Sequence, residues 1–299
     1  MAKTPPTDDA NERVISLFRD ANLPEVPLDV SHMPGAKPAT PARSDDAAAG
    51  AIDLTGKTKV VMAIGLGATG KTTLLRWACE RALERDEGDH LALATVDPVN
   101  RELAYYFPNT LSPKTQDPAE VTAWLERMLT WTMHQQRSLA VDFGGGDTTL
   151  GRLAAEVPDL QQMMDGAGVE PVAFYLLTPR SSDLTPLAAM EQTNFKPRAT
   201  ALVLNIGRSE SGKDPRDDFA QVRRHSTYKA VLARGAVELW MPRLYAAKAV
   251  EDRRIGFRPA MNGDAPEHGY GLGPFDRSRV RHWLAAMEDA FAPIASWLP

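Results

Sequence analysis

The residues best suited to chemistry lie between Gly65 and Thr73, where the sequence reads Gly-Leu-Gly-Ala-Thr-Gly-Lys-Thr-Thr. Glycines at this spacing let backbone N–H groups close around phosphate oxygens. Lys71 can then reach the β and γ phosphates of a nucleoside triphosphate, and the Thr72 hydroxyl can bind Mg²⁺. The segment predicts a phosphate-binding loop rather than an ordinary turn. Its expected nucleotide contacts are Gly65, Gly67, Ala68, Thr69, Gly70, Lys71, Thr72 and Thr73.

The flanks of this loop supply the context that phosphate binding requires. An apolar run at 60–63 precedes it, and residues 74–85 have the pattern of a helix. The N-terminus of such a helix attracts anions because its first N–H groups have no partner within the helix. We therefore expect a strand, the loop and a helix in that order.

Two carboxylates follow later apolar runs, at the ends where parallel strands gather ligands. Asp142 ends the run at 138–143, and Asp97 follows the run at 91–96. A carboxylate there can hold Mg²⁺ or orient the attacking water. Burying Asp142 without a partner would be costly, which favours a metal-side role, whereas Asp97 has capping of the next segment as its alternative.

A second glycine segment follows Asp142. Glycines 144–146 suit a loop that approaches the γ phosphate and changes conformation when that phosphate leaves. Asp147, directly after them, has two readings that remain open: a metal ligand, or a cap for the helix beginning near Leu150.

The composition is that of a globular protein, with 43% hydrophobic and 24% charged residues among 299. The single cysteine, Cys79, excludes a disulfide or a cysteine-ligated metal cluster within one chain. We find no apolar run long enough to span a bilayer and no secretion signal, so we expect a cytoplasmic location and no membrane attachment. The net charge of -5 gives no general attraction to nucleic acid.

Two regions differ in composition. Residues 1–57 are rich in proline and alanine and predict a flexible tail with a short helix over 10–21, which either recognises a protein partner or packs on the domain. Residues 58–299 form the predicted domain. Its apolar runs alternate with helical patterns, which predicts an α/β fold: a mostly parallel twisted sheet with helices on both faces. The expected strands are 59–65, 91–96, 138–143, 171–178, 200–206 and 236–241. The expected helices are 74–85, 120–133, 150–160, 184–192, 217–232, 244–253 and 277–291, with a loop over 255–275.

The order of these motifs resembles the ParA/MinD family of deviant Walker P-loop ATPases over about residues 58–260. Besides the phosphate loop, Asp97-Pro98 is similar to the family's switch I and Asp142 to its switch II aspartate. The strand ending in Asn205, and the sequence Met241-Pro242-Arg243, resemble segments that lie beside the adenine. For Asn205 the alternative is a turn residue.

The resemblance implies Mg²⁺ and ATP as ligands, with Lys71, Asp97 and Asp142 as catalytic residues and Thr72 and Asp142 at the metal. Asn205 and Pro242 would contact the nucleotide. It also implies an ATP-dependent homodimer serving DNA partition, conjugative transfer or cargo positioning.

Two departures from the family pattern bear on hydrolysis. Leu66 stands where the family has its signature lysine, which reaches the nucleotide of the partner subunit, and Thr95 replaces its first switch I aspartate. Arg101 is a candidate substitute cation, with a surface residue as the alternative.

Segments that could bind DNA or a membrane are less clearly marked in the sequence. A basic group in the C-terminal half is a candidate for non-specific DNA binding, although interleaved acidic residues also suit a solvated surface. It consists of Arg208, Lys213, Arg216, Arg223, Arg224, His225, Lys229 and Arg234. The apolar stripe over 280–291 is expected to pack in the core rather than bind a membrane.

The functional hypothesis is an ATP-binding and ATP-hydrolysing switch. One alternative is a small-molecule kinase or ATP-dependent ligase in which Asp97, Asp147 or Arg180 binds the acceptor. Another is binding without turnover.

Overall fold

The computed structural model describes residues 52–85, 90–97, 102–209, 214–266 and 269–299. The predicted α/β fold is confirmed within these residues. The predicted tail helix over 10–21 lies outside them, as do Pro98, Arg101 and Lys213.

All six predicted strands are present and form one parallel sheet in the order β2-β3-β1-β4-β5-β6. They are β1 (Thr58–Ile64), β2 (Leu91–Thr95), β3 (Ser138–Asp142), β4 (Val169–Leu177), β5 (Ala199–Asn205) and β6 (Val237–Met241). The register aligns their carboxyl ends, because Asp142 lies opposite Ala63 of β1 and Thr95 of β2. The loops after β1, β2 and β3 therefore meet at one edge of the sheet.

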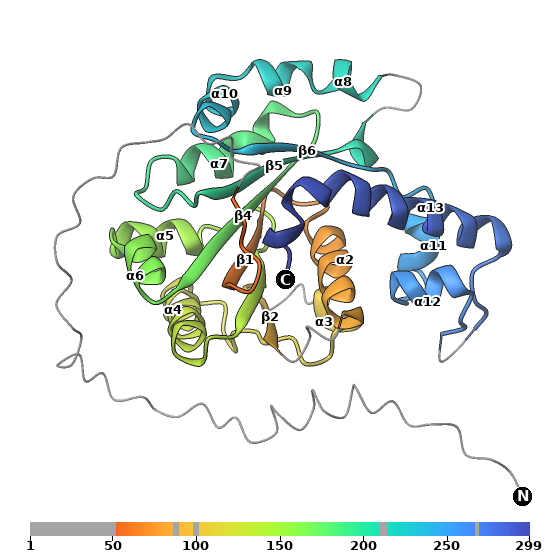
Figure 1. Cartoon of the computed structure of the whole chain (residues 1–299), viewed down its shortest axis with the longest axis horizontal. Coiled ribbons are helices and arrows are strands. Elements are labelled where there is room, and N and C mark those ends of the chain that lie inside the picture. The colour runs from red at the N-terminus through yellow and green to blue at the C-terminus, as the bar shows by residue number, and fades with distance from the viewer. Residues whose placement is uncertain (1–51, 86–89, 98–101, 210–213, 267–268) are drawn as a thin grey trace, which may run out of the picture. The chain divides into compact units, whose positions relative to one another are not determined.

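Helices cover both faces of the sheet (Figure 1), and alternate side chains of each strand face the two apolar layers. In β1, for example, Val61 and Ala63 belong to one layer, and Val60 and Met62 belong to the other. The first layer includes α2 (Lys71–Glu84), α3 (Glu102–Tyr106), α11 (Ala247–Glu251), α12 (Phe257–Asn262) and α13 (Pro274–Phe291). The second includes α4 (Pro118–Gln135), α5 (Thr149–Glu156), α6 (Leu160–Gly166), α7 (Thr185–Met190), α9 (Ala220–Arg224) and α10 (Ser226–Ala233).

Short helices complete the chain: η3 (Ser181–Leu184), η4 (Ile206–Arg208), α8 (Pro215–Asp218) and η5 (Ala292–Trp297). The predicted helix over 217–232 is in fact divided among α8, α9 and α10. Two features interrupt it. The buried Phe219 ring meets Trp240 edge-on, and His225 is extended and accepts a hydrogen bond from the Thr227 N–H. The helix predicted over 150–160 ends at Glu156 because the residue before Pro158 disfavours helical geometry.

The prediction of a loop over 255–275 is wrong in part, because α12 lies within it. The first N–H of this helix, that of Phe257, donates to the Glu80 carboxylate of α2 at 2.7 Å. A cap that comes from another helix leaves no signal in the local sequence. This contact explains why the local sequence did not predict α12.

The domain begins before the predicted boundary at residue 58. Leu54 is 2% exposed, its N–H donates to Ser296, and the Ile52 carbonyl accepts from the Trp297 indole. Residues 52–57 are thus part of the domain because they pack on its last turn.

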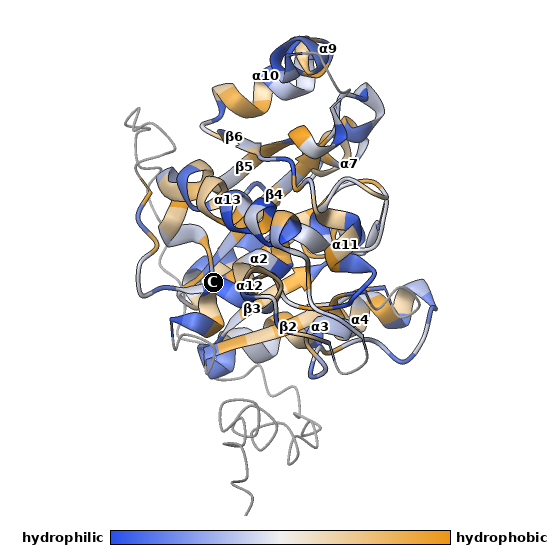
Figure 2. Cartoon of the chain, turned by 90° about the vertical axis from the view of Figure 1, so that its right-hand side faces the viewer, coloured by the Kyte–Doolittle hydropathy of each residue, from blue (hydrophilic) through white to orange (hydrophobic). Residues whose placement is uncertain are grey.

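The apolar stripe of α13 packs in the core, as expected. Its members, Val280, Trp283, Leu284, Met287 and Phe291, are all buried. Figure 2 shows the helix against the sheet, and ring contacts reinforce the packing: Phe291 meets Trp77 of α2, and Trp283 meets Phe257 of α12. In the described part of the chain, no helix has the length and apolarity needed to cross a membrane.

Candidate phosphate-binding site

The loop from Gly65 to Gly70 joins the end of β1 to the start of α2, as predicted. Gly70 has a φ of 102°, and a Cβ there would collide with the amide nitrogen of Asn205. A glycine is therefore required by both conformation and space. No acidic residue lies in the first turn of α2, so its free N–H groups present uncompensated positive potential to the loop.

Lys71 and Thr72 point to the interior of this loop. The Lys71 ammonium donates to the Leu66 carbonyl of the same loop at 2.9 Å, and the Thr69 hydroxyl donates to that carbonyl at 3.0 Å. Burial lowers the pKa of Lys71, while the charge of Asp142 opposes this shift. A buried ammonium whose partner is a neutral carbonyl is well placed to exchange it for a phosphate oxygen.

Asp142 lies beside Thr72 at the end of β3. Its Oδ2 accepts a hydrogen bond from the Thr72 hydroxyl at 2.9 Å. Its Oδ1 is buried and has no hydrogen-bond partner among the described residues. Burial raises the pKa of Asp142 to about 6. A buried oxygen without a donor fits a cation, which would supply the missing interaction.

The available side chains suit a Mg²⁺ site in which the protein supplies only some of the ligands and the nucleotide and water supply the others. Among the residues described, no three His, Cys, Asp or Glu side chains are grouped closely enough to hold a metal ion. Thr72 and Asp142 would thus provide two protein contacts, and phosphate oxygens and water would complete the coordination. Mg²⁺ is commonly bound in this way.

The second glycine segment packs directly on the phosphate loop. A Cβ on Gly145 would lie 2.7 Å from the Gly67 Cα, and the Gly146 N–H donates to the Gly65 carbonyl at 3.3 Å. Asp97 lies next to this segment, with its Oδ2 3.2 Å from the position of a Cβ on Gly144. Glycines 144–146 and Asp97 therefore gather at the Gly67 end of the loop.

We predict that Gly145→Ala destabilises the nucleotide-free protein by about 1–3 kcal/mol, because its methyl group would overlap backbone atoms that cannot move aside independently. Gly67→Ala is the matched control, since a Cβ there meets nothing within 4 Å. Urea unfolding measures both. Equal stability of the two variants would mean that the two loops do not pack as described.

A cavity of about 140 Å³ opens over these groups. Besides the predicted Gly67, Ala68, Gly70, Lys71, Thr72, Thr73, Asp97 and Asp142, it is lined by Thr95, Glu102, Phe143, Gly144, Gly145, Arg208 and Glu251. Arg208 was predicted only as part of a DNA-binding group, and Glu102 and Glu251 were not singled out. Arg208 follows β5, and Glu251 ends α11. Of these residues, only Arg208 could have been noticed in the sequence, because it lies three residues after the end of β5.

Asn205 is hydrogen-bonded to the backbone of the phosphate loop. Its side-chain amide donates to the Thr69 carbonyl at 2.8 Å, and its Oδ1 accepts from the Gly207 N–H. It is 5% exposed, so the amide is engaged by backbone on both sides. Pro242 is half-buried after β6, and its carbonyl accepts from the Trp283 indole. Pro242 and Asn205 are not among the described residues that line the cavity.

Several residues behind the alternative hypotheses form hydrogen bonds or ion pairs within the domain. Asp147 accepts hydrogen bonds from the N–H and hydroxyl of Thr149, a capping arrangement at the start of α5. Arg180 donates to Thr178 and to Asp183. In the basic group, Arg223 pairs with Glu238, and Arg234 pairs with Glu191. Arg216, Arg224 and Lys229 are exposed.

Comparisons with known proteins give little guidance. No protein-family model and no curated protein matches the sequence. One similar solved structure is FtsY from Mycoplasma mycoides, at 14% identity over 77% of this chain and 68% of that one, with a TM-score of 0.38. Another is FlhF complexed with GMPPNP and Mg²⁺, at 12% identity over 76% and 74%, with a TM-score of 0.31. At these levels of similarity, function must be inferred from the residues of the chain itself.

Proposed function

We propose that this chain is a ParA-like switch protein that binds and slowly hydrolyses a nucleoside triphosphate with Mg²⁺. The observation that supports this most directly is the contact between Thr72 and Asp142 beneath the phosphate loop. That contact leaves one buried carboxylate oxygen without a donor. An uncompensated buried oxygen next to a hydroxyl and an ammonium favours a metal-phosphate ligand.

Each side chain has a separate task in this proposal. Lys71 leaves the Leu66 carbonyl and neutralises the β and γ phosphates, and the first N–H groups of α2 donate to phosphate oxygens. Thr72 and Asp142 would hold Mg²⁺, and the ion would supply positive charge to offset the charge that builds up on the transferred phosphoryl group. Asp97, beside Gly144, is the candidate for orienting the attacking water.

The switch element in this proposal is the glycine segment at 144–146. It already rests on Gly67 and Gly65, so a γ phosphate entering at that end must meet or displace it. A segment whose resting place depends on the γ phosphate reports the difference between triphosphate and diphosphate. A partner protein or a second copy of the chain can read that difference.

The narrower role comes from the sequence resemblance. ATP as the nucleotide, an ATP-dependent homodimer, and action in plasmid partition, conjugative transfer or cargo positioning are parts of this proposal. So are the N-terminal tail as a protein-binding segment and weak contact with DNA. The small-molecule kinase or ligase has less support, because Asp147 and Arg180 make the internal hydrogen bonds described above.

The nucleotide-dependent dimer is the part of the proposal that most needs testing, because Leu66 stands where the family has its signature lysine. A leucine cannot extend a charge to the nucleotide of a partner. Arg208 is an exposed cation on the cavity wall, and the segment that carries it is tied to the phosphate loop by Asn205. We propose that it supplies the positive charge within the same chain.

Light scattering tests the switch. We expect the molar mass to double with Mg²⁺ and a slowly hydrolysed ATP analogue, and to remain that of a monomer with Mg·ADP or without nucleotide. The GTP analogue run in parallel identifies the base preference. A constant monomer mass under all conditions, despite saturating nucleotide, would refute nucleotide-dependent dimerisation.

A further inference from the structure

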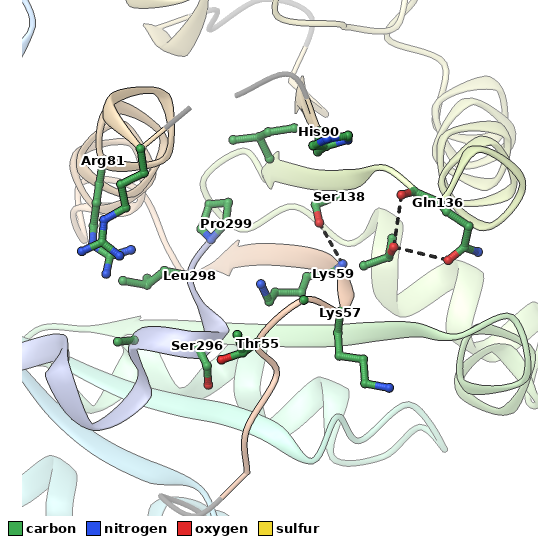
Figure 3. A pocket seen from close by; sticks show the side chains of 15 residues that line it. Thr55, Lys57, Lys59, Arg81, His90, Gln136, Ser138, Ser296, Leu298 and Pro299 are labelled. Atoms are coloured by element: carbon green, nitrogen blue, oxygen red, sulfur yellow. Dashed lines mark hydrogen bonds between the residues drawn. The ribbon is translucent and has the colours of Figure 1, made fainter. Parts of the chain in front are cut away.

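A second and larger cavity lies at the opposite edge of the sheet, where the strands begin. It has a volume of about 560 Å³, within the range of roughly 300–1,000 Å³ that small-molecule sites occupy. Its walls come from separate parts of the chain: residues 55–59 at the start of β1, the end of α2, the starts of β2 and β3, and the last residues. Figure 3 shows Lys59 near its centre, with Arg81 to one side and Gln136 to the other.

The ionisable side chains among the described residues that line this cavity are all basic. Lys57, Lys59, Arg81, Arg85 and His90 contribute to the wall, and no Asp or Glu is found among the described lining residues. Two anionic groups offset part of the charge. Glu288 pairs with Arg81 at 3.1 Å and lies 4.0 Å from Arg85, and the Asp53 carboxylate accepts from the Thr55 N–H and hydroxyl and interacts electrostatically with Lys59. An excess of positive charge remains, and a concave surface concentrates its field.

Neutral donors complete the wall. Thr55, Thr58, Gln136, Ser138 and Ser296 all line the cavity. The Ser138 hydroxyl accepts from the Lys59 N–H at 3.1 Å, and the Thr58 hydroxyl donates to the Gln136 carbonyl at 3.2 Å. These bonds fix the starts of β1 and β3 relative to each other, so this part of the wall is held by the fold.

We propose that this cavity binds a small anion that carries at least two phosphate groups. Arginine and lysine together suit phosphate, since the guanidinium offers paired donors and the ammonium offers a compact charge. Arg81 is buried and already paired. Lys57 is exposed and the Arg85 side chain is 50% exposed, so these two can turn toward a ligand. Walls from several segments enclose a small molecule better than they fit an extended nucleic acid.

The position gives the ligand a route to the phosphate loop. Strand β1 begins at this cavity and ends at that loop. Helix α2 begins at the loop and ends at the cavity, a length of about 20 Å. An anion bound by both Arg85 and Lys57 would shift the end of α2 relative to the start of β1. These two elements flank the loop that leads to Lys71. The cavity would then be a regulatory site, distinct from the nucleotide site.

Calorimetric titration of inorganic pyrophosphate into the full-length Lys71→Ala variant tests this site, because that variant lacks the lysine of the phosphate loop. We expect one binding site, weakened at least tenfold by adding Lys57→Ala and Arg85→Ala. Adding Lys229→Ala and Arg224→Ala instead removes the same charge from exposed positions and should leave the affinity unchanged.

Further titrations identify the source of the phosphates. Tighter binding of ADP than of pyrophosphate indicates a nucleotide, and the reverse indicates another phosphorylated molecule. The proposal is overturned if Lys71→Ala does not bind pyrophosphate, or if binding is unaffected by Lys57→Ala with Arg85→Ala. Neither result depends on whether the wild-type protein hydrolyses a triphosphate.

Discussion

Lys71→Ala is expected to weaken binding of Mg²⁺ with a triphosphate analogue at least about 100-fold, because the replaced ammonium is the charged donor inside the phosphate loop. The variant should remain folded. Burial lowers the pKa of Lys71, so its charge is costly in the empty protein, and alanine removes that cost. Calorimetric titration gives the affinity, and circular dichroism confirms the fold.

Lys229→Ala is the control for Lys71→Ala. It removes an equal charge from the exposed surface of α10 and should bind nucleotide like the wild type. Wild-type affinity in a folded Lys71→Ala variant would mean that the triphosphate does not occupy this loop. The proposed function would then lose its structural basis.

Asp142→Asn is expected to abolish turnover while stabilising the empty protein. Asparagine retains an oxygen that accepts from Thr72, but it has no negative charge for Mg²⁺. We expect phosphate release to fall at least about 100-fold. A carboxylate that is costly without its ligand and necessary with it is typical of a functional site.

The stability effect of Asp142→Asn has a definite dependence on pH. The pKa of Asp142 is about 6 in the folded protein, against the ordinary value of 3.8, so the folded state binds this proton more tightly than the unfolded state. Stability is therefore lost as the pH rises between these two values. The cost at pH 7.5 is about 3 kcal/mol at most, and at pH 4.5 about 1 kcal/mol.

Urea unfolding of both proteins at pH 7.5 and 4.5 checks this dependence, without nucleotide or metal. The stabilisation by Asp142→Asn should be largest at pH 7.5 and shrink at pH 4.5. Asp289→Asn, at an exposed position in α13, should show no such trend. A destabilised Asp142→Asn at pH 7.5 would show that the carboxylate is satisfied in the empty protein.

The sequence predicted the elements whose signals are local. The apolar runs located all six strands, and the glycine spacing located the loop between β1 and α2. Parallel order also brought Asp97 and Asp142 to the edge where the loop lies. The strands and the loop share one cause, because each depends on residues that are adjacent in the chain, and the parallel arrangement follows from the alternation of strands and helices.

Features created by distant contacts were missed. Glu251 reaches the cavity only because α11 joins the apolar layer that also includes α2, and α12 is capped by Glu80 from another helix. The packing of Gly145 on Gly67 joins two loops that are far apart in sequence. The basic wall of the second cavity likewise combines the start of β1 with the end of α2, which no spacing rule relates.

The most direct test of the proposed function is phosphate release from the purified wild-type protein supplied with ATP or GTP, with Mg²⁺ and then with EDTA. We predict slow release that requires Mg²⁺ and a clear preference for one base. Release that continues in EDTA, or no release and no binding of either triphosphate with Mg²⁺, would contradict a Mg²⁺-dependent triphosphate site formed by Lys71, Thr72 and Asp142.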